Sequence, residues 1–318
     1  MESNESNDVA PTALSHIIGQ KSAVAQVAVA LEAAFADGKK FDSALLIEPP
    51  GVGKSAMVRV IADEMAAQLH EVLGQSVASP ADLNGLLLTA KNRDVIHIDE
   101  AHELDKTYQT SLYLAVDQRR IALQGGRGGR GPQSVPLADF TPLASTTDEY
   151  ALLQPLRDRM KLLLRFDFYT PQELTEILRH RSRALCWKLD EQVFPLIAQR
   201  SRETPRLALR LLQACQRVCR SEGENAITLA HLDRACALEQ IDGVGLGPTE
   251  QAYLRILAGD DARLNVIASR LGLPSRTVSQ VTEPFLIRAG LVMKDDHGRR
   301  QLTAEGREHL SQTRATGV

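Results

Sequence analysis

The sequence predicts an α/β domain built on a parallel sheet, followed by a helical domain and a small domain of helices and one hairpin. Three patterns predict this order. Short apolar runs ending in glycine or acidic residues fill the first half of the 318 residues. Helical periodicity follows, and a helix–turn–helix pattern with a hairpin comes last. We predict a disordered tail at 1–12 and domains at 13–167, 168–242 and 243–318.

Composition narrows the class of protein. Hydrophobic residues make up 43% and charged residues 24%, and the net charge is −3, so any nucleic-acid contact must be a local basic patch. The chain has no apolar run near the ~20 residues of a membrane span, and its first residues lack a signal-peptide pattern. The four cysteines show no metal-binding spacing. We therefore expect a cytoplasmic protein without disulfides, zinc or membrane contact.

The segment from Asp42 to Ala56, DSALLIEPPGVGKSA, predicts a phosphate-binding loop between a strand and a helix. Gly51 and Gly53 allow backbone N–H groups to turn towards a phosphate, and the following helix adds its positive N-terminal end. Lys54 can reach the β- and γ-phosphates, and the Ser55 hydroxyl can ligate Mg²⁺. The alternative is an ordinary glycine turn after a strand.

Glu48 departs from this pattern, because it occupies the place of the motif's first glycine. A carboxylate repels a triphosphate unless it points away, is protonated or meets a cation. The interpretation as a nucleotide site stands, with its affinity left open.

A second apolar run, Asp94 to Glu100 (DVIHIDE), ends in two acids. Asp99 can hold the Mg²⁺ shell and Glu100 can polarise an attacking water. Two acids after a strand can also be a solvated loop, but their place about 45 residues after the phosphate loop favours a nucleotide site. His97 is interpreted as a hydrogen-bonded core histidine.

Periodicity predicts the remaining elements of the first domain. The predicted helices are 22–36, 53–68, 81–88 and 106–117, and the predicted strands are 44–47, 95–98, 140–147 and 162–168. The glycine- and arginine-rich stretch 124–134 reads as a hairpin tip, either a flexible connector or a binding tip.

Helices at 171–185, 191–202, 205–223 and 229–241 are predicted for the second domain, and a glycine-rich joint at 243–248 follows. Residues 243–318 then read as a winged helix, with ten Lys and Arg against eight Asp and Glu, a net of +2. Lys294, Arg299 and Arg300 gather at the hairpin, where they can contact DNA phosphates. A solvated or protein-binding wing is the alternative.

Together these blocks resemble the RuvB family of AAA+ ATPases, motors that drive branch migration of Holliday junctions. The likeness runs from about Leu14 to Leu310. It is carried by IIGQ (17–20), PPGVGKS (49–55), IDEAH (98–102), STT (145–147), PLRDR (155–159), DFYTP (167–171), TPR (204–206) and EPFLIRAGL (283–291). The resemblance implies an AAA+ P-loop core, a helical lid and a DNA-binding winged helix.

The resemblance also implies roles for single residues. Thr146 looks like the sensor of the γ-phosphate or the water, Arg159 like an arginine finger that reaches a neighbouring subunit, and Arg206 like the second sensor. The implied catalytic set is Lys54, Asp99, Glu100, Thr146, Arg159 and Arg206. The implied ATP contacts are Ile17, Ile18, Gly51, Gly53, Lys54, Ser55, Ala56, Tyr169, Arg159 and Arg206, and the implied Mg²⁺ ligands are Ser55 and Asp99. A ring, expected to be a hexamer, is implied as the active form.

Several positions depart from the family pattern. Asp148 stands where the family has arginine, Glu203 replaces a glycine, and AlaProThr replaces the arginine–proline before the adenine motif. The apolar hairpin tip with which the family contacts its partner RuvA is replaced by GGRGGRG, so a RuvA-like partner is possible but would lack that apolar contact. We expect an ATP-driven DNA motor at Holliday junctions. The alternative is a non-translocating adaptor of the same family with weak ATPase activity.

Overall fold

The computed structural model describes residues 10–47, 49–123 and 133–315. It forms two compact units, Met1–Tyr169 and Thr170–Val318. Glu48, residues 1–9 of the predicted tail and most of the predicted glycine-rich tip lie outside the described residues. In the described part of the chain, helices long and apolar enough to cross a membrane are absent.

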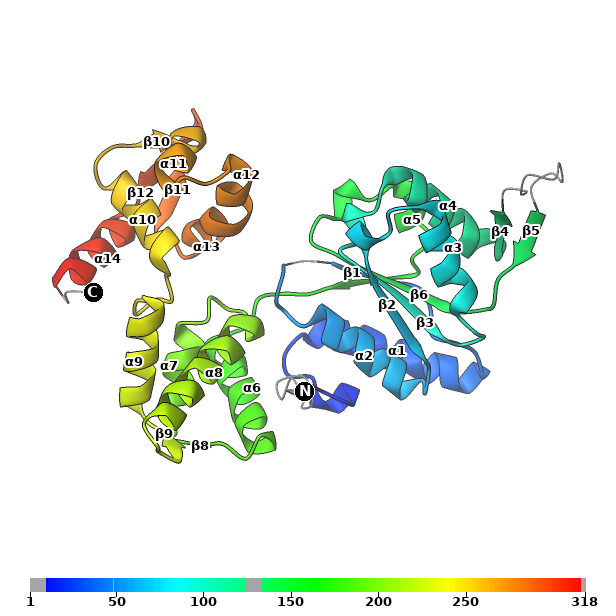
Figure 1. Ribbon diagram of the computed structural model, residues 1–318, viewed down its shortest axis with the longest axis horizontal. Helices are drawn as coiled ribbons and strands as arrows, with labels where there is room; N and C mark the ends of the chain where they lie inside the picture. Colours follow the sequence, from blue (N-terminus) through cyan, green and yellow to red (C-terminus); the bar gives the residue numbers. More distant parts are fainter. Residues whose placement is uncertain (1–9, 48, 124–132, 316–318) are drawn as a thin grey trace. The chain divides into compact units, whose positions relative to one another are not determined.

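The first unit is built on a five-stranded parallel sheet with the strand order β2-β3-β6-β1-β7 (Figure 1). The strands are β1 (Ala44–Ile47), β2 (Leu69–Leu73), β3 (Val95–Asp99), β6 (Thr141–Thr146) and β7 (Leu162–Arg165). Four of them confirm the predicted strands, which are apolar because a parallel sheet is covered on both faces. The sequence prediction missed β2, whose residues LHEVL are only partly buried at the sheet edge.

Helices cover both faces of this sheet, with α1 and α2 on one side and α3 and α4 on the other (Figure 1). They span α1 (Lys21–Asp37), α2 (Lys54–Glu64), α3 (Pro80–Thr89), α4 (Lys106–Gln118) and the short α5 (Gln154–Arg157). The predicted helix at 53–68 is four residues too long, because residues 65–68 turn back into β2. An antiparallel pair, β4 (Arg120–Leu123) and β5 (Gln133–Pro136), confirms the predicted hairpin.

The second unit begins with the four predicted helices of the lid. They are α6 (Pro171–Ala184), α7 (Val193–Gln199), α8 (Pro205–Ser221) and α9 (Leu229–Glu239). Thr170 and Glu173 cap α6 reciprocally, which explains its sharp start. A two-stranded parallel pair, β8 (Lys188–Leu189) and β9 (Ala226–Ile227), was not predicted, since two residues are too short for a periodic signal.

The rest of the second unit confirms the predicted winged helix. Its elements are α10 (Pro248–Leu257), β10 (Ala262–Arg263), α11 (Leu264–Leu271), α12 (Ser275–Thr277), α13 (Glu283–Arg288), β11 (Val292–Lys294), β12 (Arg299–Leu302) and α14 (Ala304–Ala315). The predicted helix at 275–289 contains a π-helical turn at Val278–Thr282. Pro284 follows this turn and has no N–H to donate, so the helical bonding pattern changes just before it.

Side-chain contacts fasten the lid to the winged helix at the predicted glycine-rich joint. The Arg202 guanidinium donates to the carbonyl of Gly245 at 2.7 Å and pairs with Glu250 at 2.8 Å. Asp242 lies 2.9 Å from His309 of α14. A Cβ at Gly245 would fall 2.2 Å from a backbone oxygen, so this glycine is needed for close packing. The joint is therefore a packed contact and not a free linker.

The structure accounts for one departure from the family pattern, the glutamate at position 203 in place of a glycine. Its φ is +62°, a left-handed conformation that glycine adopts most easily. Its carboxylate accepts a hydrogen bond from Arg288 of the winged helix at 2.6 Å. Glutamate at position 203 therefore costs backbone strain, and its carboxylate adds an ion pair between the lid and the winged helix.

Candidate nucleotide-binding site

The phosphate loop lies between β1 and α2, as predicted. Gly51 and Gly53 have φ of +84° and +101°, which side chains rarely adopt. Lys54 is buried, and its ammonium donates to the carbonyl of Pro49 at 3.2 Å, so the lysine folds over the loop. The first-turn N–H groups of α2, from Lys54 to Ala56, have no partner inside the helix. The loop therefore offers N–H donors and a cation, which fit a polyphosphate.

Strand order brings the two predicted acids to this loop. β6 lies between β1 and β3, with Ile47 opposite Thr146 and Ile98 opposite Ala144. Since parallel strands end at the same edge of a sheet, the phosphate loop after β1 and the acids after β3 share that edge. The structure therefore gathers the predicted loop, Asp99 and Glu100 in one place.

Asp99 presents one free carboxylate oxygen. Its Oδ1 accepts hydrogen bonds from the Glu100 N–H at 3.0 Å and from the Ser145 hydroxyl. Within the described residues, Oδ2 has no recorded protein partner. The side chain is thus held by one oxygen and has the other available for a cation or for water, as a Mg²⁺-shell carboxylate requires.

Glu100 has a φ of +47°, an uncommon value for a residue with a side chain. Its Oε2 accepts from the Thr147 hydroxyl at 3.2 Å and lies 3.3 Å from His102 Nδ1. The predicted sensor Thr146 is fully buried, and its hydroxyl lies 3.1 Å from the same His102 nitrogen. Thr147 and His102 were missed by the sequence interpretation, although both lie inside the quoted STT and IDEAH blocks.

The predicted adenine-side residues approach the loop through hydrogen bonds. Ile17 and Ile18 are half-buried, and Gln20 exchanges two hydrogen bonds with the backbone of Asp167, at 2.8 and 3.0 Å. Tyr169 is buried, and its hydroxyl donates to the carbonyl of Val52 in the phosphate loop at 3.1 Å. Tyr169 therefore contacts the loop, and Gln20 of the predicted adenine-side block is joined to Asp167, two residues before Tyr169.

Arg159 lies at the other end of β1. Its carbonyl accepts from Ser43, the residue before β1, at 2.9 Å, whereas the phosphate loop comes after β1. Four strand residues, about 13 Å, separate the two ends. The guanidinium lies over the Tyr113 ring at 4.8 Å and pairs with Asp117 at 3.3 Å, both on α4. Arg159 therefore faces away from the phosphate loop of its own chain.

Arg206 lies in the second unit, in the first turn of α8, where it is exposed. The phosphate loop belongs to the first unit, so the role of Arg206 as second sensor stays a prediction.

The three predicted DNA contacts of the winged helix differ in burial and in the sheet face on which they lie. Arg300 is buried and makes two hydrogen bonds to the Glu283 carboxylate, at 2.8 and 3.2 Å. Lys294 lies on the same face, opposite Arg300, and is 3.4 Å from Glu283. Arg299 alternates to the other face and is exposed. The Arg300 guanidinium is committed to this internal ion pair, so its contact with DNA stays a prediction against which its burial argues.

Two further arginines accompany Arg299 and were missed from the sequence. Arg263 is its direct cross-strand partner, and Arg270 lines the same surface depression, together with Asp260 and Asp261. None of these three guanidinium groups has an ion pair within the described residues. Opposed like charges destabilise a sheet, so the Arg263–Arg299 pair does not stabilise the β10–β12 pairing.

Comparison with known proteins identifies the family. The family models of the Holliday junction DNA helicase RuvB P-loop domain, the RuvB AAA lid domain and the RuvB C-terminal winged helix domain match residues 9–166, 169–242 and 243–311. A Holliday junction branch migration complex subunit RuvB from Kosmotoga olearia is 32% identical over 313 residues, covering 97% of this chain and 91% of that protein. The chain belongs to the RuvB family.

Other relatives agree. The RuvB subunit of Prochlorococcus marinus strain MIT 9313 is 35% identical over 306 residues, 94% of this chain and 87% of that protein. The solved Thermotoga maritima RuvB Holliday junction branch migration motor superposes with a TM-score of 0.83 at 30% identity, covering 95% of this chain and 98% of that one. The family resemblance inferred from the motifs and the predicted fold class are thus confirmed.

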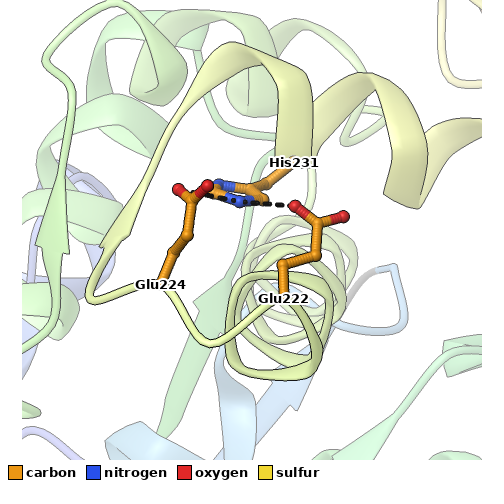
Figure 2. A group of neighbouring side chains, drawn as sticks. All are labelled: Glu222, Glu224 and His231. Atoms are coloured by element: carbon orange, nitrogen blue, oxygen red, sulfur yellow. Dashed lines mark ion pairs between the residues drawn. The ribbon is translucent and has the colours of Figure 1, made fainter.

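Outside the RuvB-family motifs, one side-chain cluster in the lid has the composition of a metal site. His231 Nε2 lies 3.1 Å from Glu222 and 3.3 Å from Glu224 (Figure 2). His231 Nδ1 accepts from the Thr228 N–H at 2.9 Å, so in the neutral ring the proton is on Nε2 and already points at the carboxylates. We assign the cluster to capping of α9.

Gly74 supports the turn of Glu100 in the RuvB-family P-loop domain. A Cβ at Gly74 would lie 2.5 Å from the Glu100 carbonyl oxygen, so the backbone would have to move. We expect Gly74→Ala to lower the free energy of unfolding by about 1–3 kcal/mol and to slow ATP hydrolysis. Gly85→Ala is the control, because its Cβ meets nothing within 4 Å and alanine favours its helix. Denaturant unfolding and single-turnover hydrolysis check this, and equal effects of both changes would contradict it.

Proposed function

We propose that this chain is an ATP-hydrolysing subunit of a motor that drives branch migration at Holliday junctions. The observation that carries the proposal is the division of the catalytic groups along β1. The phosphate loop, Asp99 and Glu100 lie at one end, and Arg159 lies at the other. A chain arranged in this way lacks an arginine finger at its own site. It can supply Arg159 to the site of a neighbouring subunit.

The residues present fit a nucleotide with its cation. Lys54 and the first-turn N–H groups of α2 would hold the phosphates, Ser55 and Asp99 would hold Mg²⁺, and Tyr169 with Ile17 and Ile18 would line the nucleotide's other end. Bound ATP would supply the phosphoryl group transferred to water, and bound Mg²⁺ would supply positive charge at its oxygens.

The chain's own residues then account for hydrolysis. Glu100 orients the attacking water, and Thr147 and His102 hold the Glu100 carboxylate through its Oε2. Lys54 and the neighbouring subunit's copy of Arg159 offset negative charge as it develops. Arg206, in the first turn of α8, reports the nucleotide state to the lid, and the joint at Arg202 transmits it to the winged helix.

The proposal also covers the partners of the chain and its location in the cell. The chain acts as a ring, expected to be a hexamer, on Holliday junction or other duplex DNA in the cytoplasm. A RuvA-like partner is possible, but its contact would not be the family's apolar tip, because the stretch 124–134 (QGGRGGRGPQS) contains no large apolar residue.

The deciding experiment compares ATPase turnover alone, with linear duplex and with a synthetic four-way junction, together with strand exchange of that junction. We expect junction DNA to stimulate turnover and ATP to drive branch migration, with Lys54→Ala inactive in both assays. ATP binding without hydrolysis or migration under all three conditions would replace the motor by the non-translocating adaptor.

The winged helix gives a prediction for DNA affinity. Each phosphate contact contributes about −0.9 to the slope of log K against log salt, so Arg263→Ala with Arg299→Ala should flatten the slope by about two for each engaged wing. Arg217→Ala on α8 of the lid is the control and should leave the slope unchanged. Fluorescence anisotropy with labelled duplex, at salt concentrations from about 50 to 200 mM, measures the slope. An unchanged slope in the double variant would assign the wing to protein contacts.

A further inference from the structure

A continuous row of polar side chains crosses three strands of the sheet and ends at Asp99. Glu71 Oε1 lies 3.1 Å from His97 Nδ1, His97 Nε2 lies 2.9 Å from the Ser145 hydroxyl, and that hydroxyl donates to Asp99 Oδ1. Glu71 and His97 are direct partners in the β2–β3 register, and Asp99 is two residues beyond His97. The row therefore lies along one face of the sheet.

The row is buried where an apolar core is expected. His97 and Ser145 are fully buried, and their neighbours in the strands include Ile96, Ile98 and Ala144. A buried polar group costs free energy unless it is hydrogen-bonded, and apolar residues of similar size would avoid that cost. At its far end Glu71 pairs with Arg59 of α2 at 3.5 Å. The hydrogen bond from His97 is the main cause that lowers the pKa of Glu71, so this acceptor is ionised at neutral pH.

We infer that Ser145, His97 and Glu71 are positioning residues that fix the Asp99 carboxylate for its cation. Ser145 and the Glu100 N–H hold Oδ1, which leaves Oδ2 as the oxygen turned to the cation. His97 fixes the rotation of the Ser145 hydroxyl, and Glu71 fixes the His97 ring. The inference rests on the proposed ATPase function, because it concerns the Mg²⁺ ligand of that site.

The test measures cation affinity without turnover. A fluorescent ATP analogue is titrated with Mg²⁺ on the full chain, and the half-saturating Mg²⁺ concentration is compared between variants. Groups that orient metal ligands typically change metal affinity about ten- to a hundredfold, so Ser145→Ala and His97→Phe should raise that concentration about tenfold or more. Nucleotide affinity in EDTA should stay unchanged. Because both act through one row, the double variant should show little more than either single change.

The control is Thr141→Val, at the opposite end of the same strand. Its hydroxyl is equally buried and donates to the carbonyl of Phe41 at 2.8 Å, so its loss costs stability far from Asp99. It should lower the melting temperature and leave the Mg²⁺ midpoint unchanged. Glu71→Gln, at the half-exposed end of the row, keeps a hydrogen-bond acceptor and should cause a smaller shift of the Mg²⁺ midpoint. It tests the inference even when the buried variants do not fold.

Three outcomes would overturn the inference. Equal Mg²⁺ midpoints in folded Ser145→Ala, Glu71→Gln and the wild type would reject it while leaving the ATPase proposal intact, and so would a matching shift in Thr141→Val. A wild-type protein whose nucleotide binding ignores Mg²⁺ would reject the inference and the proposed function together.

Discussion

Glu100→Gln is expected to retain ATP and to lower its hydrolysis at least about a hundredfold, the usual contribution of a positioned general base. The amide keeps the size of the side chain but cannot accept a proton from water. The Thr147 hydroxyl can still donate to the amide oxygen, so the local structure should persist. Nucleotide binding by fluorescence and turnover by phosphate release measure the two quantities separately.

Glu103→Gln is the matched control for this prediction. Glu103 lies on the same turn and is 3.4 Å from His102 Nε2, whereas Glu100 approaches the other nitrogen of that ring. Its turnover should stay within about twofold of the wild type. Turnover of Glu100→Gln within the same twofold range would remove Glu100 from the role of water-orienting base.

Arg159→Ala is expected to lower turnover by about a thousandfold or more without loss of ATP binding, as for other arginine fingers. Mixing these subunits with Lys54→Ala subunits should restore part of the activity. One interface of a mixed ring then combines an intact phosphate loop with an intact arginine. The physical reason is the position of Arg159 beside Ser43, a full strand length from its own loop.

Arg157→Ala in the same PLRDR block serves as the control. Its guanidinium lies over the Tyr150 ring at 5.4 Å and 3.9 Å from Glu149, contacts that serve local packing. Rings of this variant should stay active without mixing. If mixed rings of Arg159→Ala and Lys54→Ala form and show no recovery at any ratio, action across the interface is wrong.

The sequence predicted those parts of the site that depend on order along the chain. A buried parallel strand needs an apolar run, and the residues directly after that run must lie at the carboxyl edge of the sheet. For this reason β1, β3, Asp99 and Glu100 could be placed without coordinates. β2 could not, because an edge strand carries polar residues such as Glu71 and has no strict apolar pattern. Because β2 was missed, the polar row that ends at Asp99 was not predicted either, apart from the core position of His97.

Properties that depend on which face a side chain takes were beyond the sequence interpretation. Lys294, Arg299 and Arg300 look alike as a basic cluster, yet strand alternation places Arg300 and Lys294 beside the buried Glu283, where both form ion pairs, and leaves Arg299 exposed. Arg263 joins Arg299 only through the β10–β12 register, 36 residues away in sequence. Likewise, STT offers two threonines, and only the structure brings the Thr147 hydroxyl to Glu100.

The packed joint between lid and winged helix has a mechanical consequence. Arg202 with Glu250, Glu203 with Arg288 and Asp242 with His309 cross it at separate points, and several contacts of this kind resist bending better than one. A small rotation imposed at the first turn of α8 is then not absorbed between the two domains. Such a rotation would displace the far edge of the winged helix by more than the lid, because displacement grows with distance from the rotation axis. Under the proposed function, a rotation of the lid would therefore move DNA held by the winged helix farther than the lid itself moves.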